Sequence, residues 1–222
     1  MLKKERFKAV LFDMDGIIIN SEIYWEKIEK EYARLKGLKY TDSYRRTIMA
    51  LSERELAEVL RARHGLKETV EQIVTERGFM ALGIYKKEAK LLPDFLLLIK
   101  KLHGKYKIAL VSSSPFKWIN PILRRFKIKK YFDEIISAEE MRDGHGKPHP
   151  AIYLFAARRL GVRPKDCLVF EDSVNGVKAA KAAGMFCVAV PGVWVKDRRG
   201  VGEADLVAKH LGDRKIVEIL IQ

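Results

Sequence analysis

The sequence contains few cysteines and no long hydrophobic segment. Only two of its 222 residues are cysteines, Cys167 and Cys187, which excludes a disulfide framework and a four-cysteine zinc site. Both lie in apolar runs, and we expect two core thiols in a reducing cytoplasm. No apolar stretch approaches the roughly 20 residues that a membrane-spanning helix needs, and the N-terminus shows no signal peptide. We therefore expect a cytoplasmic protein without a membrane partner.

The composition is that of a folded, basic protein. Hydrophobic residues make up 48% of the chain and charged residues 32%, so the chain can bury a core. The 43 lysines and arginines outnumber the 29 acidic residues, and the formal net charge is +14. This charge favours anionic partners, either phosphorylated metabolites or nucleic acid. The length fits one large domain or one domain that carries an insertion.

The hydrophobic pattern divides the chain into two kinds of region. Residues 8–12 form a short apolar run that ends at Asp13, as expected of a buried parallel strand. Residues 21–90 show helical periodicity, with an interruption expected near Gly78 or Gly83. Beyond Pro93, helical and strand patterns alternate. The helices are expected at 22–36, 52–64, 68–90, 94–103, 116–126, 148–160, 174–183 and 216–220, and the later strands at 106–111, 132–137, 167–170, 186–190 and 205–207.

This alternation predicts an α/β fold. A Rossmann-like parallel sheet with helices on both faces is expected from residues 1–20 and 91–222. Residues 21–90 do not fit the alternation, so we interpret them as an α-helical cap inserted after the first strand. In such an open sheet the ligand crevice lies at the carboxyl ends of the strands.

Two acidic pairs stand at predicted strand ends. Asp13 and Asp15 follow the first strand, and their mutual repulsion would be relieved by a hard dication such as Mg²⁺. The alternative for this pair is an Asx-turn in a surface loop. Glu171 and Asp172 follow a later strand, where they could also bind the metal. In the alternative, Asp172 is only the N-cap of the helix that begins near Val174.

Hydroxyl and amine groups occupy the other predicted strand ends. Ser112 and Ser113 could supply hydroxyl and backbone N–H groups to phosphate oxygens, or could belong to an ordinary polar loop. Lys147, expected at the start of a helix, could neutralise a phosphate and offset the charge of Asp13, or could be a surface lysine. Together the four groups equip a site for phosphoryl transfer through an aspartyl-phosphate.

These residues stand in four recognisable motifs. They are V-L-F-D-M-D-G (10–16), A-L-V-S-S-S (109–114), Lys147 in G-K-P-H-P, and V-F-E-D-S-V-N-G-V-K-A-A-K-A-A-G (169–184). With them, essentially the whole chain resembles the haloacid dehalogenase superfamily of phosphohydrolases. Within it, the chain is similar to the β-phosphoglucomutase-like and phosphoglycolate-phosphatase-like subfamily, which has a helical cap after the first strand.

The resemblance implies a role for each motif residue. Asp13 would attack phosphorus, and Asp15 would protonate the leaving alcohol and later deprotonate water. Mg²⁺ would bind Asp13, the backbone carbonyl of Asp15, and Asp172, with Glu171 close by or bound through water. The phosphoryl oxygens would be bound by Ser112, Ser113 and Lys147.

The resemblance leaves the substrate open. We expect a phosphatase for a small sugar phosphate or organic-acid phosphate, with Trp25 and Arg46 of the cap as candidate substrate contacts. Mutases of the β-phosphoglucomutase type carry a histidine where this chain has Trp25, which favours hydrolysis over the alternative mutase activity. A non-enzymatic anion-binding or nucleic-acid-binding protein is a remote alternative, because the basic stretch 124–130 fits a solvated helix end. A monomer or a weak homodimer is expected.

Overall fold

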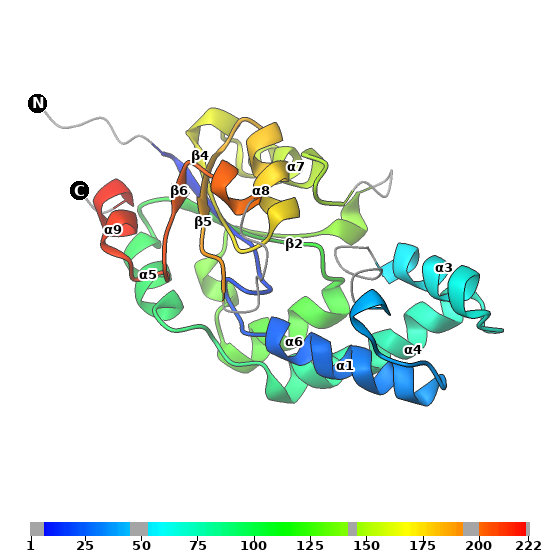
Figure 1. Ribbon diagram of the computed structural model, residues 1–222. Helices are drawn as coiled ribbons and strands as arrows, with labels where there is room; N and C mark the ends of the chain where they lie inside the picture. Colours follow the sequence, from blue (N-terminus) through cyan, green and yellow to red (C-terminus); the bar gives the residue numbers. More distant parts are fainter. Residues whose placement is uncertain (1–6, 45–52, 142–145, 193–199, 221–222) are drawn as a thin grey trace, which may run out of the picture. The chain divides into compact units, whose positions relative to one another are not determined.

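The computed structural model describes residues 7–44, 53–141, 146–192 and 200–220 (Figure 1). The chain forms two compact units, one of Met1–Asn20 with Lys90–Gln222 and one of Ser21–Ala89. We call them the sheet unit and the helical unit. No helix of the described residues is both long and apolar enough to cross a membrane.

The sheet unit is built on six strands in the order β3-β2-β1-β4-β5-β6, and every neighbouring pair is parallel. This confirms the predicted parallel α/β sheet. The central strands are apolar on both faces, which suits a sheet covered by helices on both sides. The strands are β1 (Ala9–Phe12), β2 (Lys107–Ser112), β3 (Glu134–Ser137), β4 (Cys167–Glu171), β5 (Phe186–Ala189) and β6 (Leu206–Val207).

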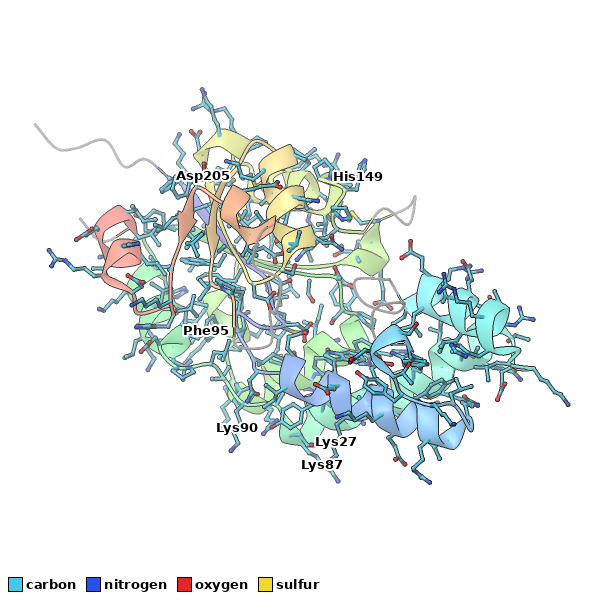
Figure 2. The ribbon with its side chains drawn as sticks, in the orientation of Figure 1. Lys27, Lys87, Lys90, Phe95, His149 and Asp205 are labelled. Atoms are coloured by element: carbon cyan, nitrogen blue, oxygen red, sulfur yellow. The ribbon has the colours of Figure 1, made fainter. Side chains whose placement is uncertain are left out.

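Helices cover both faces of this sheet. On one face, Leu11, Val111 and Val169 belong to a buried cluster with residues of α7 and α8, and both free cysteines lie in this cluster. On the other face, the ring of Phe95, labelled in Figure 2, meets the ring of Phe12 edge-on at 5.7 Å. The helices are α5 (Phe95–Leu102), α6 (Phe116–Phe126), α7 (Ala151–Leu160), α8 (Val174–Ala182) and α9 (Arg214–Leu220).

The helical unit contains α1 (Glu22–Leu35), α3 (Glu53–His64), α4 (Val70–Gly83) and a π-helical turn, η1 (Ile84–Glu88). The expected interruption therefore falls after Gly83, whereas Gly78 lies buried inside α4. A capping box between Thr69 and Gln72 begins α4. Residue 52, where the helix expected at 52–64 would begin, lies outside the described residues.

A buried arginine joins three helices of the helical unit. Arg77 on α4 is 1% exposed and binds Glu29 on α1 through two hydrogen bonds of 3.0 and 2.6 Å. It also binds Glu53 on α3 at 2.9 Å, and its guanidinium lies 5.3 Å from the centre of the Tyr32 ring. Each nitrogen of the planar guanidinium thus donates to a carboxylate, which is the geometry that compensates a buried charge.

The two ends of the sheet unit that flank the helical unit are held side by side. Ile19 and Leu91 form an antiparallel bridge, and the Leu92 N–H donates to the Ile18 carbonyl at 2.9 Å. The Asn20 N–H donates to the Lys90 carbonyl at 3.0 Å, and the Lys90 N–H donates to Asn20 Oδ1 at 2.7 Å. This short ladder fixes where the chain leaves the sheet unit and where it returns.

Candidate active site

The topology gathers the polar strand ends around β1. Because β1 lies between β2 and β4, Phe12 is in register with Leu110 on one side and Phe170 on the other. The Asp13 N–H continues this ladder and donates to the Phe170 carbonyl at 3.1 Å. Residues that are far apart in the sequence therefore meet at the carboxyl edge of the sheet.

Lys147 bridges two carboxylates at this edge. Its Nζ lies 2.6 Å from Asp13 Oδ1 and 2.6 Å from Glu171 Oε1, and its side chain is 7% exposed. The interpretation of Lys147 as a surface lysine is therefore wrong. The residue also does not begin a helix, because it lies in the turn before α7, whose N-cap is Pro150.

The electrostatics of this pair reflect an excess of buried acid. Burial raises the pKa of Asp13 well above its ordinary value, and the carboxylates of Glu171, Asp172 and Asp15 add to the rise, while Lys147 opposes it. Burial alone would lower the pKa of Lys147, but the charges of Asp13 and Glu171 outweigh it and raise that pKa. Lys147 is thus a permanent cation among carboxylates that it neutralises incompletely.

Glu171 is held by donors on both of its oxygens. Oε1 accepts from Lys147 and from the Tyr153 hydroxyl at 2.5 Å, and Oε2 accepts from the Ser173 hydroxyl at 3.1 Å. Burial and the Glu171 charge raise the pKa of Tyr153, so its hydroxyl remains a donor. A Cβ at Gly176 would collide with this carboxylate, so α8 packs directly on it. Glu171 thereby fixes the position of Lys147.

Asp172 does not cap α8. The N-cap is Ser173, whose hydroxyl accepts from the Gly176 N–H at 3.0 Å, so the capping interpretation of Asp172 is wrong. The backbone of Gly16, with φ of 83°, lies against the Asp172 carboxylate, and a Cβ there would collide with it. Only glycine combines this positive φ with so close an approach.

The carboxylates of Asp13, Glu171 and Asp172 fit a hard divalent cation. Oxygens of the three lie within 4.8 Å of one another, and all three residues are buried. An all-oxygen donor set of this kind suits Mg²⁺, and a dication would offset the charge that Lys147 leaves uncompensated.

Asp15 has a partner that the sequence did not identify. The Ser114 hydroxyl donates to Asp15 Oδ2 at 2.7 Å. Ser112 is 1% exposed and accepts from the Ser114 N–H at 3.0 Å, whereas Ser113 is exposed. Phosphate binding by Ser112 and Ser113 stays a prediction.

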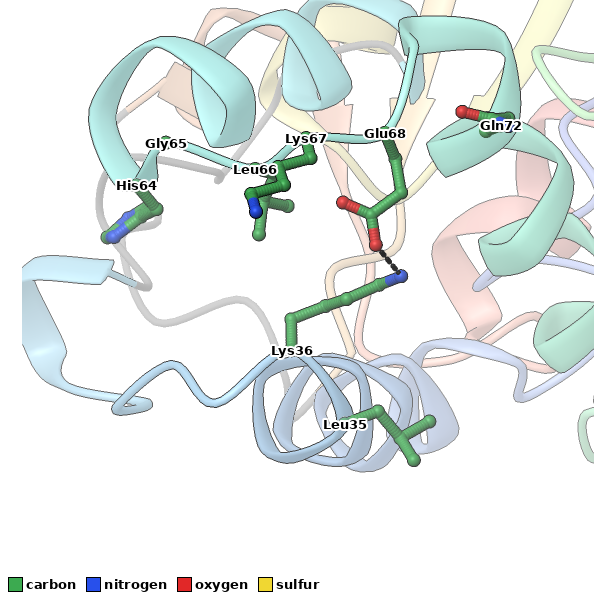
Figure 3. Close-up of a pocket in the computed structure, with 8 residues that line it drawn as sticks. All are labelled: Leu35, Lys36, His64, Gly65, Leu66, Lys67, Glu68 and Gln72. Carbon is green, nitrogen blue, oxygen red and sulfur yellow. Dashed lines mark hydrogen bonds and ion pairs between the residues drawn. The ribbon is translucent and has the colours of Figure 1, made fainter.

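The candidate substrate contacts in the helical unit also stay predictions. Trp25 is partly buried on α1, and Arg46 lies outside the described residues. An open hollow of about 640 Å³ at the ends of α1 and α3 is lined by Lys36, His64, Lys67 and Glu68, among others (Figure 3). Its Lys36 and Glu68 pair with each other at 2.5 Å, and we assign the hollow no chemistry.

Sequence reasoning missed Tyr153 and Ser114 for different reasons. Tyr153 falls on the apolar face of an amphipathic helix, where it reads as a core residue. A buried tyrosine hydroxyl needs a partner, and this could have directed attention to it. Ser114 reads as one of three loop serines, and nothing in their order indicates which one reaches an aspartate.

Comparison with known proteins places this geometry in a family. Residues 7–184 match the haloacid dehalogenase-like hydrolases, and the chain belongs to that family. It is 34% identical over 181 residues to the phosphorylated carbohydrates phosphatase of Thermotoga maritima, which covers 80% of this chain and 82% of that protein. It is likewise 34% identical over 190 residues to hexitol phosphatase B of Escherichia coli, with coverages of 82% and 83%.

Solved structures confirm the fold. A β-phosphoglucomutase from Clostridium difficile superposes with a TM-score of 0.77 at 23% identity and covers 96% of each chain. The protein CbbY from Rhodobacter sphaeroides, solved in complex with phosphate, gives a TM-score of 0.81 at 23% identity, covering 96% of this chain and 99% of that one.

Proposed function

We propose that the protein is a Mg²⁺-dependent phosphatase that hydrolyses a small phosphorylated carbohydrate through an aspartyl-phosphate. The observation that carries the proposal is the buried contact between Asp13 and Lys147 beside Asp15 and Asp172. The reaction requires a carboxylate as the nucleophile, an ammonium group that stabilises the phosphoryl charge, and a second carboxylate that gives and accepts a proton.

In the first half-reaction, Asp13 is the nucleophile. One of its oxygens attacks phosphorus while the bond between phosphorus and the ester oxygen breaks. Lys147 lies within 2.6 Å of Asp13 and would stabilise the negative charge that spreads over the phosphoryl oxygens. Asp15 would give its proton to the leaving alcohol, so that no free alkoxide is released.

In the second half-reaction, Asp15 acts as the base. It accepts a proton from water, the water oxygen attacks phosphorus, and the bond to Asp13 breaks to regenerate its carboxylate. Ser112 and Ser113 are proposed to orient the phosphoryl group in both steps, and Glu171 keeps Lys147 in place.

Asp13, Asp172 and the backbone carbonyl of Asp15 would hold Mg²⁺, which supplies charge neutralisation for the phosphoryl group when bound. Glu171 lies within the same group of carboxylates, but both of its oxygens already accept hydrogen bonds from protein donors. We therefore assign it to the support of Lys147 and to any contact with the metal through water.

The substrate class rests on the relatives. Two proteins that are 34% identical over four-fifths of this chain are named phosphatases of phosphorylated carbohydrates and of hexitol phosphates. A third, 28% identical, is named a fructose-1-phosphate phosphatase. We therefore propose a hexose phosphate or a hexitol phosphate as the substrate.

Phosphate release from a panel of sugar phosphates and from p-nitrophenyl phosphate tests the proposal. The wild type should release phosphate with Mg²⁺ and lose this activity in EDTA. Asp13→Asn should be inactive under both conditions, because it lacks the nucleophile. Equal release by wild type and variant would refute the nucleophile, and conversion of glucose 1-phosphate to glucose 6-phosphate without release would favour a mutase.

A further inference from the structure

We infer that Ser114 is a positioning residue for Asp15, which it holds in the orientation needed for proton transfer to the leaving alcohol. The inference deepens the proposed function and rests on it. It starts from the 2.7 Å hydrogen bond from the Ser114 hydroxyl to Asp15 Oδ2, both in the sheet unit.

Ser114 is itself held in place by two hydrogen bonds of its backbone. Its N–H donates to the Ser112 hydroxyl oxygen at 3.0 Å, and its carbonyl accepts from the Ser137 hydroxyl at 2.9 Å. Ser137 is fully buried at the end of β3, in register with Ser112 at the end of β2. The Ser137 N–H in turn donates to Glu140 Oε2 at 3.2 Å. Ser114 is 7% exposed, and its hydroxyl is therefore attached to a backbone that is fixed in position.

Asp15, in contrast, stands on a tight turn after β1. The turn is closed by the Gly16 N–H on the Ile19 carbonyl at 2.8 Å and by the Ile18 N–H on the Met14 carbonyl at 2.9 Å. The Asp15 side chain on this turn is partly exposed, and its χ angles have more than one staggered position. A hydrogen bond from a fixed hydroxyl favours one of these positions. A fixed orientation promotes proton transfer, because the acid and the leaving oxygen must lie within hydrogen-bond distance of each other.

The bond also distinguishes the two oxygens of Asp15. A serine hydroxyl has one hydrogen, and in this geometry the hydrogen points to Oδ2. The acid proton of Asp15 is therefore carried by Oδ1, from which it passes to the ester oxygen as the bond to phosphorus breaks. The carboxylate that remains keeps the Ser114 hydrogen bond on Oδ2, and Oδ1 accepts the proton of the attacking water in the second step.

The chemistry of the leaving group separates this role from a structural one. A sugar alcohol is a poor leaving group and needs a proton as it departs, whereas p-nitrophenolate departs without one. The ratio kcat/KM reports the steps up to transfer of the phosphoryl group to Asp13. A variant that only disorients Asp15 should lose kcat/KM for the sugar phosphate and keep it for the aryl phosphate.

The experiment compares wild type, Ser114→Ala and Ser114→Thr with p-nitrophenyl phosphate and with fructose 1-phosphate or sorbitol 6-phosphate, whichever the wild type hydrolyses faster. We expect Ser114→Ala to lower kcat/KM for the sugar phosphate about ten- to a hundredfold, because the variant keeps Asp15 and so loses only part of the effect of a general acid. For the aryl phosphate, kcat/KM should change less than about twofold. Ser114→Thr, which keeps the hydroxyl, should restore most of the loss.

Equal losses on both esters, or no loss on either, would overturn the inference. A crystal structure of Ser114→Ala gives a readout that needs no turnover, since the Asp15 carboxylate should leave its wild-type position. An unchanged Asp15 would also overturn the inference. A wild type that hydrolyses neither ester would contradict the proposed function instead, and the crystallographic result would still decide the Ser114 contact.

Discussion

Buried charge occurs in both units, but it is balanced differently. In the helical unit, Arg77 is enclosed by Glu29 and Glu53, and the side chain of Glu53 is 30% exposed, so the surplus negative charge reaches water. In the sheet unit, Lys147 binds Asp13 and Glu171, which form a cluster with Asp172, and all three acids are less than 10% exposed. The structural cluster thus leaves its surplus charge to the solvent, whereas the cluster at the candidate active site keeps a buried excess of acid that a bound cation would offset.

The largest expected effect is on the structural cluster. Arg77→Met leaves two glutamates without a buried partner, and it should lower the free energy of unfolding by about 3–5 kcal/mol. Urea denaturation measures this, with Arg61→Met on the exposed face of α3 as the control. An Arg77→Met protein as stable as the control would show that the cluster does not support the unit.

The second effect is on the acidic cluster at the candidate active site, Asp13, Glu171 and Asp172. Mg²⁺ at 100 times its dissociation constant should raise the free energy of unfolding by about 2.7 kcal/mol, because it binds only the folded state. Thermal unfolding with Mg²⁺ and with EDTA measures the shift. Asp172→Asn should lose it, since one of the clustered carboxylates is gone. A shift that survives in Asp172→Asn would move the metal away from this cluster.

The third prediction is that removal of the Asp13 charge stabilises the protein. Because the folded-state pKa of Asp13 is raised, its ionised form destabilises the fold at neutral pH, and Asp13→Asn in EDTA should raise the midpoint of urea denaturation. The contribution of Asp13 is favourable below its ordinary pKa of 3.8 and is lost as the pH rises through the folded-state value, so the gain should shrink toward acid pH.

The matched change in the helical unit should act in the opposite direction. Glu29→Gln removes a partner of Arg77 and should destabilise the protein in the same denaturation assay. If Asp13→Asn and Glu29→Gln changed the free energy of unfolding in the same direction, the two clusters would not differ in how their charge is balanced.

The smallest effect is expected where charges are exposed. Lys107 and Asp133 form an ion pair at 3.3 Å with side chains 58% and 41% exposed. Lys107→Ala should change stability by less than about 1 kcal/mol, since solvent already screens the pair. A larger loss in urea denaturation would mean that burial is not what separates the strong charge clusters from the weak ones.

The fold was predictable because periodicity records which faces are buried. Strand β1 and helix α6 lie where the apolar pattern placed them. The errors concern single residues at helix ends. Lys147 lies in the turn before α7 rather than at the start of a helix, and Ser173 rather than Asp172 caps α8. Side-chain hydrogen bonds decide these positions, and hydrophobic periodicity does not contain them.

The site was predictable in its members and not in its contacts. The motifs named Asp13, Lys147 and Glu171, but their spacing could not indicate that one lysine bridges the two acids. The position of Arg77 in the sequence indicates a buried charge cluster. It falls on the buried stripe of α4 with Val70, Ile73 and Ala81, and an arginine on such a stripe requires acidic partners from other helices.

The ladder between Ile19 and Leu91 has a consequence for the history of such proteins. The polypeptide departs from and rejoins the sheet unit at adjacent points, so the whole excursion of residues 21–89 is one continuous stretch of gene. A single recombination event could replace it without altering the strand order or the acids at the strand ends. A lineage could thus exchange residues 21–89 as one segment while the sheet unit was inherited intact.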